Sequence, residues 1–249
     1  MEGYQQSTYG QRYAPHYDTW HADFMDTDAA VAKLAELAGA GGSALDLGSG
    51  TGRLAVPLAA RGITVHAIEI APEMVAQMRA KPGGDAVRMT VGDMAETELA
   101  ERFELVYIGH NTIMALPDQA TQVACFRNAA RHLRPGGRFA LETMFSQGRG
   151  GDRRDNVSCM TIEPDEVMLM VSSADPVTGV FTGSQIVLRP EGTTFYPVRG
   201  RGVTHFEMDL MAQLAGLQLE ARWGDWHEAP FTAASAYHVS VYRSGRPAH

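Results

Sequence analysis

The sequence predicts a doubly wound α/β fold, in which helices cover both faces of a mostly parallel sheet, with an antiparallel β insertion near the end. Between residues 43 and 143, strand-like runs alternate with segments of helical periodicity. The nearly continuous apolar run at 103–108 is typical of a strand buried on both faces. After Phe145 the pattern changes to strand-like runs without helices between them. Right-handed crossovers then favour a parallel sheet between two helical layers.

The elements are expected in the following order. A helix from about Asp26 to Ala38 ends at Gly39. Parallel strands are expected at 43–47, 63–69, 86–91, 103–108 and 138–143. A helix is expected after each of the first two strands, and Asp118 is expected to cap a helix that follows the fourth strand. The Arg-Pro-Gly-Gly sequence at 134–137 predicts a turn into the fifth strand. The insertion is expected to hold strands at 167–171 and 180–188, with hairpin turns at 175–179 and 189–192. The chain is then expected to form a helix at 206–215 and to complete the central sheet with strands at 217–223 and 237–242.

Composition favours one soluble, cytoplasmic domain over residues 1–249. With 45% hydrophobic residues, the chain can bury one large core. Its apolar stretches are broken before the roughly 20 residues of a membrane span, and the N-terminus has no apolar signal-peptide core. A net charge of −8 disfavours nucleic acid as a partner, whereas a homodimer is compatible with the sequence. Cys125 and Cys159 have no Cys or His at metal-ligand spacing, so no metal site is expected.

The strongest chemical signal is the glycine loop Gly48-Ser-Gly-Thr-Gly52 between a strand and a helix. Alternate glycines allow positive φ and let backbone N–H groups approach a ligand at the helix N-terminus. Asp46 ends the strand before the loop, and Glu69 ends the next strand, where a carboxylate can bind ribose hydroxyls. Asp93 stands after the third strand and can accept from an adenine amine. The G-x-G-x-G spacing, unlike G-x-G-x-x-G, favours S-adenosylmethionine (SAM) over NAD because SAM has no phosphate to seat.

These motifs resemble those of the class I SAM-dependent methyltransferases. The matching residues are Leu45-Asp-Leu-Gly-Ser-Gly-Thr-Gly52, Glu69 with Pro72, Gly92-Asp93, and Leu133-Arg-Pro-Gly-Gly137. The resemblance implies a seven-stranded, Rossmann-like sheet with an antiparallel last strand, which Tyr237–Tyr242 would supply. It also implies four parts: an N-terminal helical cover (1–42), a SAM-binding core (43–145), an inserted antiparallel acceptor lid (146–205), and a final helix with closing strands (206–249).

The acceptor is expected to bind beside the cover and the turn Gly109-His110-Asn111. The stretch 13–21 resembles the leader of small-molecule N-methyltransferases, although a helix that merely docks by its aromatic residues fits equally well. His110 lies at the carboxyl edge of the sheet and is the candidate catalytic base for a hydroxyl or amine, whereas a His that only bonds the backbone is the alternative. Asn111 can hold the SAM ammonium through its carbonyl oxygen. His16, His21 and Glu142 are further candidate bases, and an amine that arrives neutral needs none.

The resemblance therefore implies an EC 2.1.1 type enzyme that transfers a methyl group from SAM to N or O of a small-molecule or natural-product acceptor by in-line displacement. Three alternatives stay open: an N-methyltransferase for the N-terminal amine of a peptide, an NAD-dependent oxidoreductase, and a non-catalytic SAM-binding protein. The residues expected to contact the cofactor are Tyr13, Trp20, Asp46, Gly48, Ser49, Gly50, Gly52, Glu69, Ile70, Met74, Gly92, Asp93, Met94, Gly109, His110 and Asn111.

Overall fold

A seven-stranded sheet forms the centre of the molecule. The computed structural model describes all residues except 22–25, 145–153 and 246–249. Within it the strand order is β10-β11-β5-β4-β1-β2-β3. The neighbours among β1 to β5 are parallel, and β11 pairs antiparallel with both β5 and β10. The strands are β1 (Ser43–Leu47), β2 (Thr64–Glu69), β3 (Arg88–Val91), β4 (Phe103–Ile108), β5 (Leu133–Met144), β10 (Leu217–Trp223) and β11 (Tyr237–Ser244). The predicted doubly wound sheet with an antiparallel last strand is confirmed.

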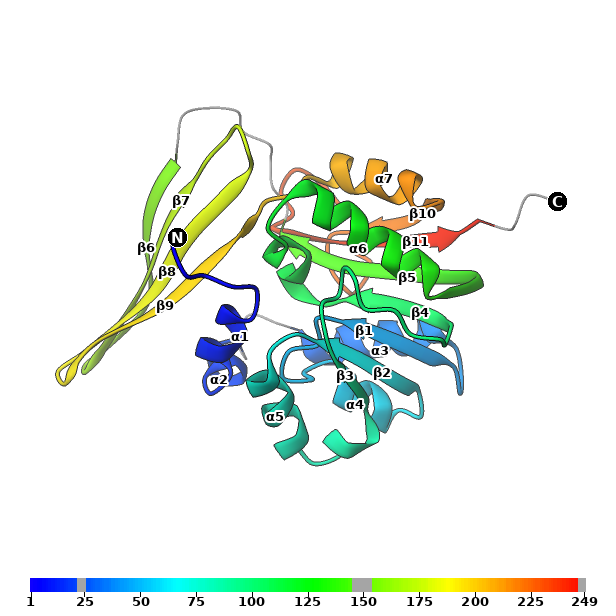
Figure 1. Ribbon diagram of the computed structural model, residues 1–249, viewed down its shortest axis with the longest axis horizontal. Helices are drawn as coiled ribbons and strands as arrows, with labels where there is room; N and C mark the ends of the chain where they lie inside the picture. Colours follow the sequence, from blue (N-terminus) through cyan, green and yellow to red (C-terminus); the bar gives the residue numbers. More distant parts are fainter. Residues whose placement is uncertain (22–25, 145–153, 246–249) are drawn as a thin grey trace.

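Helices cover both faces of this sheet (Figure 1). Side chains of β4 alternate between two hydrophobic cores. Leu105 and Tyr107 belong to the core under α3 (Thr27–Ala38) and α4 (Ala55–Ala60), and Val106 and Ile108 belong to the core under α6 (Gln119–Arg131) and α7 (His205–Leu214). Burial on both faces explains why the 103–108 run is continuously apolar. The helices are α3 (Thr27–Ala38), α4 (Ala55–Ala60), α5 (Pro72–Ala80), α6 (Gln119–Arg131) and α7 (His205–Leu214), with short 3-10 segments η2 (Gly84–Ala86) and η3 (His110–Ala115).

Two helix starts follow the predicted caps. The Asp26 side chain accepts a hydrogen bond from the backbone N–H of Ala29 at 3.0 Å, and Asp118 accepts from that of Thr121 at 2.8 Å. Each bond satisfies an N–H group that the first turn of a helix leaves without a partner. α3 and α6 therefore begin where the sequence places them.

One boundary in the central sheet was predicted incorrectly. β5 begins at Leu133, which pairs with Phe103, rather than at Arg138. The pairing then jumps to Leu105 opposite Arg138, so residues 134–137 form a bulge inside the strand. Leu133 therefore belongs to β5.

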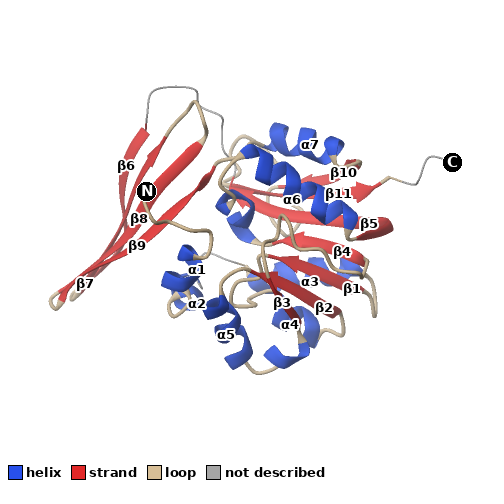
Figure 2. Ribbon diagram, viewed as in Figure 1, coloured by secondary structure: helices blue, strands red, loops and turns tan. Residues whose placement is uncertain are grey.

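A separate four-stranded antiparallel sheet, called here the lid, follows β5 in the chain (Figure 2). Its strands are β6 (Arg154–Glu163), β7 (Glu166–Ala174), β8 (Val180–Arg189) and β9 (Gly192–Arg201). The sequence patterns assigned strands only within β7 and β8, so β6 and β9 extend the prediction. The expected loop around Gly148, Gly150 and Gly151 lies outside the described residues. The predicted antiparallel insertion is confirmed.

Two short helices, called here the cover, lie between the central sheet and the lid (Figure 1). They are α1 (Thr8–Tyr13) and α2 (Tyr17–His21). Tyr13 shares a buried cluster with Met74 of α5 and with Met168, Val187 and Tyr196 of the lid. The cover therefore packs on both sheets at once.

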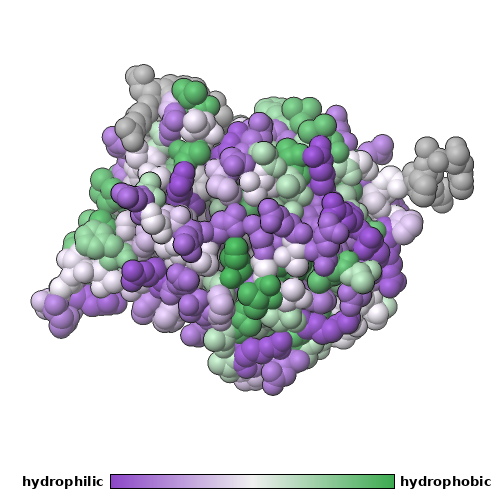
Figure 3. All heavy atoms as spheres, in the orientation of Figure 1, coloured by the Kyte–Doolittle hydropathy of each residue, from purple (hydrophilic) through white to green (hydrophobic). Residues whose placement is uncertain are grey.

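One surface of the molecule is distinctly apolar. Hydrophobic side chains gather along the upper edge of the view in Figure 3, where α7 lies. Phe206, Leu210 and Leu214 of this helix are 70, 60 and 62% exposed. Within the described part of the chain, no helix combines the length and the apolar character that crossing a bilayer requires.

Candidate functional site

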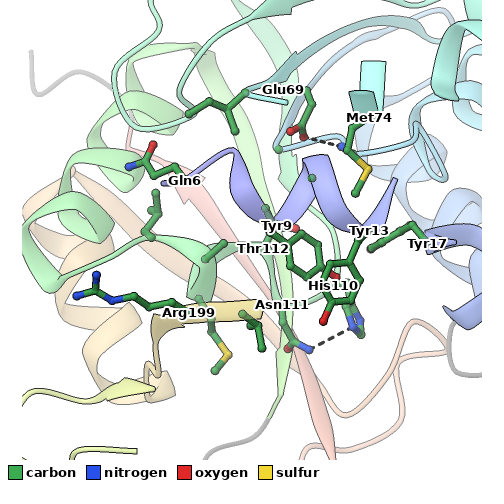
Figure 4. Close-up of a pocket in the computed structure, with 18 of the residues that line it drawn as sticks. Gln6, Tyr9, Tyr13, Tyr17, Glu69, Met74, His110, Asn111, Thr112 and Arg199 are labelled. Atoms are coloured by element: carbon green, nitrogen blue, oxygen red, sulfur yellow. Dashed lines mark hydrogen bonds between the residues drawn. The ribbon is translucent and has the colours of Figure 1, made fainter. Parts of the chain in front are cut away.

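A cavity of about 360 Å³ opens at the carboxyl ends of β1, β2 and β4 and is closed by the cover and the lid (Figure 4). β1 and β4 are neighbours at the point where the strand order changes direction. Ligands of open α/β sheets bind at such a point, and pockets for small molecules have volumes of roughly 300–1,000 Å³. The cavity thus has the place and the size of a small-molecule site.

The three glycines of the loop after β1 have different structural roles. All three have positive φ, from 55° to 75°. A Cβ atom on Gly48 would lie 2.4 Å from Cγ2 of Thr112, and one on Gly52 would lie 2.6 Å from Met78. A Cβ on Gly50 would instead meet nothing nearer than the Met74 sulfur at 4.0 Å. Gly48 and Gly52 therefore allow close packing, whereas the backbone at Gly50 is open to a ligand.

Glu69 links this loop to the end of β2. Its Oε2 accepts a hydrogen bond from the Gly50 N–H at 2.8 Å, and its Oε1 accepts one from the Ala71 N–H at 2.9 Å. Burial raises the pKa of Glu69, and these backbone donors oppose that shift. Each carboxylate oxygen retains a further lone pair on the cavity side, which fits the ribose hydroxyls expected there.

Asp93 and Met94 form the adjoining part of the wall, after β3. Asp93 Oδ1 accepts from the Ala95 N–H at 2.8 Å, which fixes the carboxylate in a tight turn. Its Oδ2 makes no protein hydrogen bond among the described residues. Met94 is only 7% exposed and presents a flat apolar surface beside it. An adenine amine above Met94 would therefore find a carboxylate acceptor, as the sequence predicts.

Most of the residues predicted to contact the cofactor line the cavity. They are Tyr13, Gly48, Gly50, Glu69, Ile70, Met74, Gly92, Asp93, Met94, His110 and Asn111. Five others lie behind the wall: Trp20, Asp46, Ser49, Gly52 and Gly109. The Trp20 ring packs edge-on against Tyr196, with ring centroids 4.8 Å apart. Asp46 is 3% exposed, and burial raises its pKa to about 7. Direct contact of these five residues with a cofactor stays a prediction.

His110 and Asn111 are fixed by the end of β5. Asn111 Oδ1 accepts from the Met144 N–H at 2.7 Å and from Thr143 Oγ1 at 3.3 Å, so its amide nitrogen faces the His110 ring. This nitrogen donates to His110 Nε2 at 3.3 Å, which places the His110 proton on Nδ1. Two consequences differ from expectation. The Asn111 oxygen predicted to hold the SAM ammonium already has two donors, and the Nε2 lone pair of the predicted base is already engaged.

The backbone and the charge state of His110 are unusual. Its φ of 46° is rare for a residue with a side chain, and its N–H donates to Glu142 Oε2 at 3.1 Å. Burial, together with the neighbouring His21 and Arg53, lowers the pKa of His110 to about 3. The imidazole is therefore neutral at physiological pH and is a weak base.

His21 faces His110 across the cavity, with ring centroids 6.0 Å apart. Its Nδ1 lies 2.8 Å from the carbonyl oxygen of Tyr17. A carbonyl only accepts, so Nδ1 carries the proton and Nε2 keeps a lone pair. Burial lowers the pKa of His21, so this ring is also neutral. Of these two imidazoles, His21 retains the lone pair that can take a proton.

Arg53, directly after the glycine loop, was not predicted as a site residue. Its Nη1 donates to Thr27 Oγ1 at 2.9 Å, and no carboxylate of the described residues forms an ion pair with it. Its positive charge acts on the pKa values of Tyr17, His21 and His110. An unpaired guanidinium at this end of the site is suited to the carboxylate of a methionyl group. An arginine directly after the last loop glycine is the sequence signal that could have identified it.

The cover is tied to the core and to the lid by polar contacts. Asp18 accepts a hydrogen bond from Thr51 Oγ1 at 2.6 Å and pairs with Lys81 at 2.7 Å. On the other side, the Tyr13 hydroxyl donates to the backbone carbonyl of Tyr196 at 3.0 Å. Gly10 allows the close approach to α5, because a Cβ there would lie 2.3 Å from that of Ala71. The cover therefore closes one side of the cavity.

The wall formed by the lid, the first residues of the chain, η3 with Leu116, and the end of β5 was missed by sequence reasoning. Its members are mostly apolar and come from segments that carry no motif. They include Tyr4, Gln6, Tyr9, Met114, Leu116, Met144, Met160, Met170, Phe181, Gln185, Val198 and Arg199. Their shared signal is the high content of methionine and aromatic residues, which are adaptable apolar surfaces.

Comparison with known proteins relates this site to one chemistry. A family model described as a methyltransferase domain matches residues 44–137. The cypemycin N-terminal methyltransferase of a Streptomyces species is 28% identical over 198 residues, covering 78% of this chain and 80% of that protein.

Solved structures agree over almost the whole chain. The CcbJ methyltransferase from Streptomyces caelestis matches with a TM-score of 0.90 and 35% identity, covering 97% of this chain and all of that one. SAM-bound CalS10, an amino pentose methyltransferase from Micromonospora echinaspora, matches with a TM-score of 0.61 and 21% identity over 97% of this chain and 92% of that chain. The latter comparison supports the fold alone.

Proposed function

Because the chain belongs to the SAM-dependent methyltransferase family, we propose that it methylates an amine nitrogen of a small-molecule or peptide natural product. Family membership decides against the NAD-dependent oxidoreductase. The choice of nitrogen over oxygen depends on the site itself. The observation that supports it is the neutral, weakly basic pair of imidazoles at the acceptor side.

The cofactor half of the cavity fits SAM. The open backbone at Gly50, the Glu69 carboxylate and the free oxygen of Asp93 would receive the methionyl, ribose and adenine groups respectively. Met74 and Met94 would supply apolar contacts. Arg53, which does not itself line the cavity, would act on the methionyl carboxylate from beyond the glycine loop. When bound, SAM supplies a methyl carbon that a positively charged sulfur has already activated.

Nitrogen is favoured because a hydroxyl needs an effective base, and His21, the one of the two imidazoles with a free lone pair, is a weak base because burial lowers its pKa. His110 has a pKa of about 3 and its Nε2 accepts from Asn111, so it cannot efficiently take a proton from an alcohol. Glu142 is held by the His110 N–H and by Trp226 Nε1 at 2.9 Å. An amine in its neutral form already presents a lone pair, and an apolar pocket favours that neutral form.

The chain's own residues then contribute orientation, exclusion of water and a proton acceptor. The cover and the lid shield part of the cavity from water, and holding both reactants in one site raises their effective concentration. His110, donating through Nδ1, is placed to orient the acceptor. His21 Nε2 is placed to receive the proton that a methylated amine releases. His110 thus acts in this proposal as a hydrogen-bond donor rather than as the base predicted from sequence.

A peptide acceptor is the second candidate within the same chemistry. It is supported by the 28% identity with a protein whose name describes N-terminal methylation. Because the cavity is partly open, it would admit a peptide N-terminus as well as an amino sugar or another amine. The two candidates differ only in the body attached to the nitrogen.

The test uses binding and turnover separately. Calorimetric titration with SAM, S-adenosylhomocysteine and NADH should show binding of the first two alone. Turnover is then followed as S-adenosylhomocysteine release with matched amine and alcohol acceptors, including short peptides with free or acetylated N-termini. We expect methylation of amines only. SAM binding without transfer to any acceptor would support the non-catalytic alternative, and efficient methylation of an alcohol would contradict the assignment to nitrogen.

His110→Asn separates the two roles of the imidazole, because Asn tolerates a positive φ. If His110 orients the acceptor, the variant should raise KM for an amine more than it lowers kcat. A loss of turnover confined to hydroxyl acceptors would instead identify His110 as a base.

A further inference from the structure

The acceptor half of the cavity is mostly apolar and contains one cation. Arg199 of β9 is the only lysine or arginine among the described residues that line the cavity. It lies on the side of the pocket that also holds Gln6, away from Met74 and Tyr17 (Figure 4). The surrounding wall consists of Met114, Met160, Met170, Phe181 and Val198.

The Arg199 guanidinium has no counter-ion in the protein. Its Nε is buried and has no hydrogen-bond partner, and no carboxylate of the described residues forms an ion pair with it. The neighbouring phenol of Tyr4 is not an anion, because burial raises its pKa and the group stays protonated. Arg199 therefore carries an uncompensated positive charge at the cavity wall.

Arg201, two residues further along the same strand, shows the contrast. Its Nη2 lies 2.7 Å from Glu207 Oε1, and its Nη1 donates to Gln122 Oε1 at 2.8 Å. The fold thus supplies partners to an arginine that serves structure. At Arg199 it supplies none, although acidic residues outnumber basic ones in the chain by 29 to 21.

Arg199 is half-buried, and a guanidinium whose buried Nε has no partner is unfavourable and is retained where a ligand completes it. Its planar donors match the two oxygens of a carboxylate. One positive charge in an apolar wall balances one negative charge, which favours a carboxylate over a phosphate monoester with nearly two.

We propose that Arg199 binds a carboxylate of the acceptor, so that the acceptor is an amine whose apolar body carries an acid group remote from the reacting nitrogen. This inference deepens the proposed function and rests on it. The amine end lies toward His21 and His110, the apolar body lies against the methionines of the lid, and the carboxylate reaches Arg199. The pocket then selects amino acids with long apolar bodies, or peptides with a free acid group, over simple amines.

The charge is tested with probes that need no turnover. Octanoate, octanamide and octyl phosphate are titrated by calorimetry into the protein saturated with S-adenosylhomocysteine. We expect octanoate to bind at least tenfold more tightly than octanamide, and also more tightly than octyl phosphate. Arg199→Gln should abolish the difference between octanoate and octanamide. Arg189→Gln is the matched control, because it removes a charge from the same sheet outside the cavity, where Arg189 pairs with Glu166.

A second measurement separates binding from folding. Arg199→Met replaces the charge with an apolar side chain of similar length, so the ligand-free protein should melt at a higher temperature than the wild type. If Arg199 only supports the fold, its removal would lower the melting temperature, as Arg201→Met should.

Equal binding of octanoate and octanamide to the wild type would overturn the proposal, as would a preference that survives in Arg199→Gln. Tighter binding of octyl phosphate would overturn the assignment to a carboxylate. SAM titration distinguishes the two levels of inference. If SAM binds normally but octanoate binds no more tightly than octanamide, only the acid subsite is ruled out. If SAM does not bind, the proposed function is ruled out, and octanoate is then titrated into the unliganded protein to test the acid subsite by itself.

Discussion

Replacing Glu69 by glutamine should weaken both the fold and cofactor binding. In the structure both carboxylate oxygens accept backbone hydrogen bonds, from Gly50 and from Ala71. Glutamine has the same shape but only one oxygen, so its amide group must face one of these N–H donors. A buried donor left without a partner costs about 1–3 kcal/mol in unfolding free energy. Loss of the charged acceptor for the ribose costs a similar amount, which raises the Kd for SAM roughly 5- to 150-fold.

Asp93→Asn is the matched comparison. The asparagine oxygen can still accept from Ala95, so the turn should survive and the melting temperature should stay near that of the wild type. Its amide then faces the position predicted for the adenine amine, where two donors oppose each other. SAM binding should weaken by about 1–3 kcal/mol without a change in stability. Thermal unfolding without ligand and calorimetric titration with SAM measure the two effects independently.

The outcome that would refute this reasoning is specific. If Glu69→Gln binds SAM as tightly as the wild type, the β2 carboxylate does not contact the ribose. If the variant keeps full stability as well, the hydrogen bonds to the glycine loop have no energetic weight. A large loss of stability in Asp93→Asn would show that this carboxylate holds the fold rather than the cofactor.

Three further predictions concern packing, the cover and acid stability. Gly10→Ala should lower the unfolding free energy by about 1–3 kcal/mol despite the better helix propensity of alanine, because the new Cβ overlaps Ala71. Gly202→Ala is the control, since its Cβ would meet nothing nearer than 3.8 Å, and denaturant titration should show no change in its stability. Asp18→Ala removes the hydrogen bond and the ion pair that tie the cover to Thr51 and Lys81, and stopped-flow measurement should show SAM leaving about 2- to 5-fold faster. An unchanged rate would mean that these contacts do not limit release. The folded state keeps the buried His110 neutral because its pKa is lowered to about 3, whereas the unfolded state binds a proton at this residue below pH 6.5. The free energy of unfolding should therefore fall as the pH is lowered, by ~1.5 kcal/mol between pH 6.5 and 5. The His110→Asn variant should lack this loss of stability.

The sequence was informative wherever one physical requirement acted on neighbouring residues. The parallel strands were predictable because burial on both faces needs continuous apolar runs, and α6 was predictable from the cap at Asp118. β6 was not, because residues 155–160 are exposed along the edge of the lid and show no alternation of polar and apolar side chains. The start of β5 was missed because Pro135 and two glycines indicate a turn, and a bulge within a strand has the same composition.

The same requirement separates the site residues that could be predicted from those that could not. Gly50, Glu69 and Asp93 could be found because parallel strands bring their carboxyl ends to one edge, whichever residues follow later in the chain. The acceptor wall could not, because Met170 faces the cavity only through its register opposite Gln185, and register across a lid is set by distant pairing. The protonation of His110 depends on the amide of Asn111 and thus on β5, which no spacing in the sequence reveals.

The position of β11 has a consequence for how the molecule is made. β11 lies between β5 and β10, although it follows both in the chain. During synthesis, β10 therefore has no partner in the central sheet until residue 244 has left the ribosome. Until β11 has been synthesised, the edges of β5 and β10 that pair with it stay open. We expect molecules interrupted before Tyr237 to aggregate through that edge, and the last step of assembly to be a strand sliding into a preformed gap.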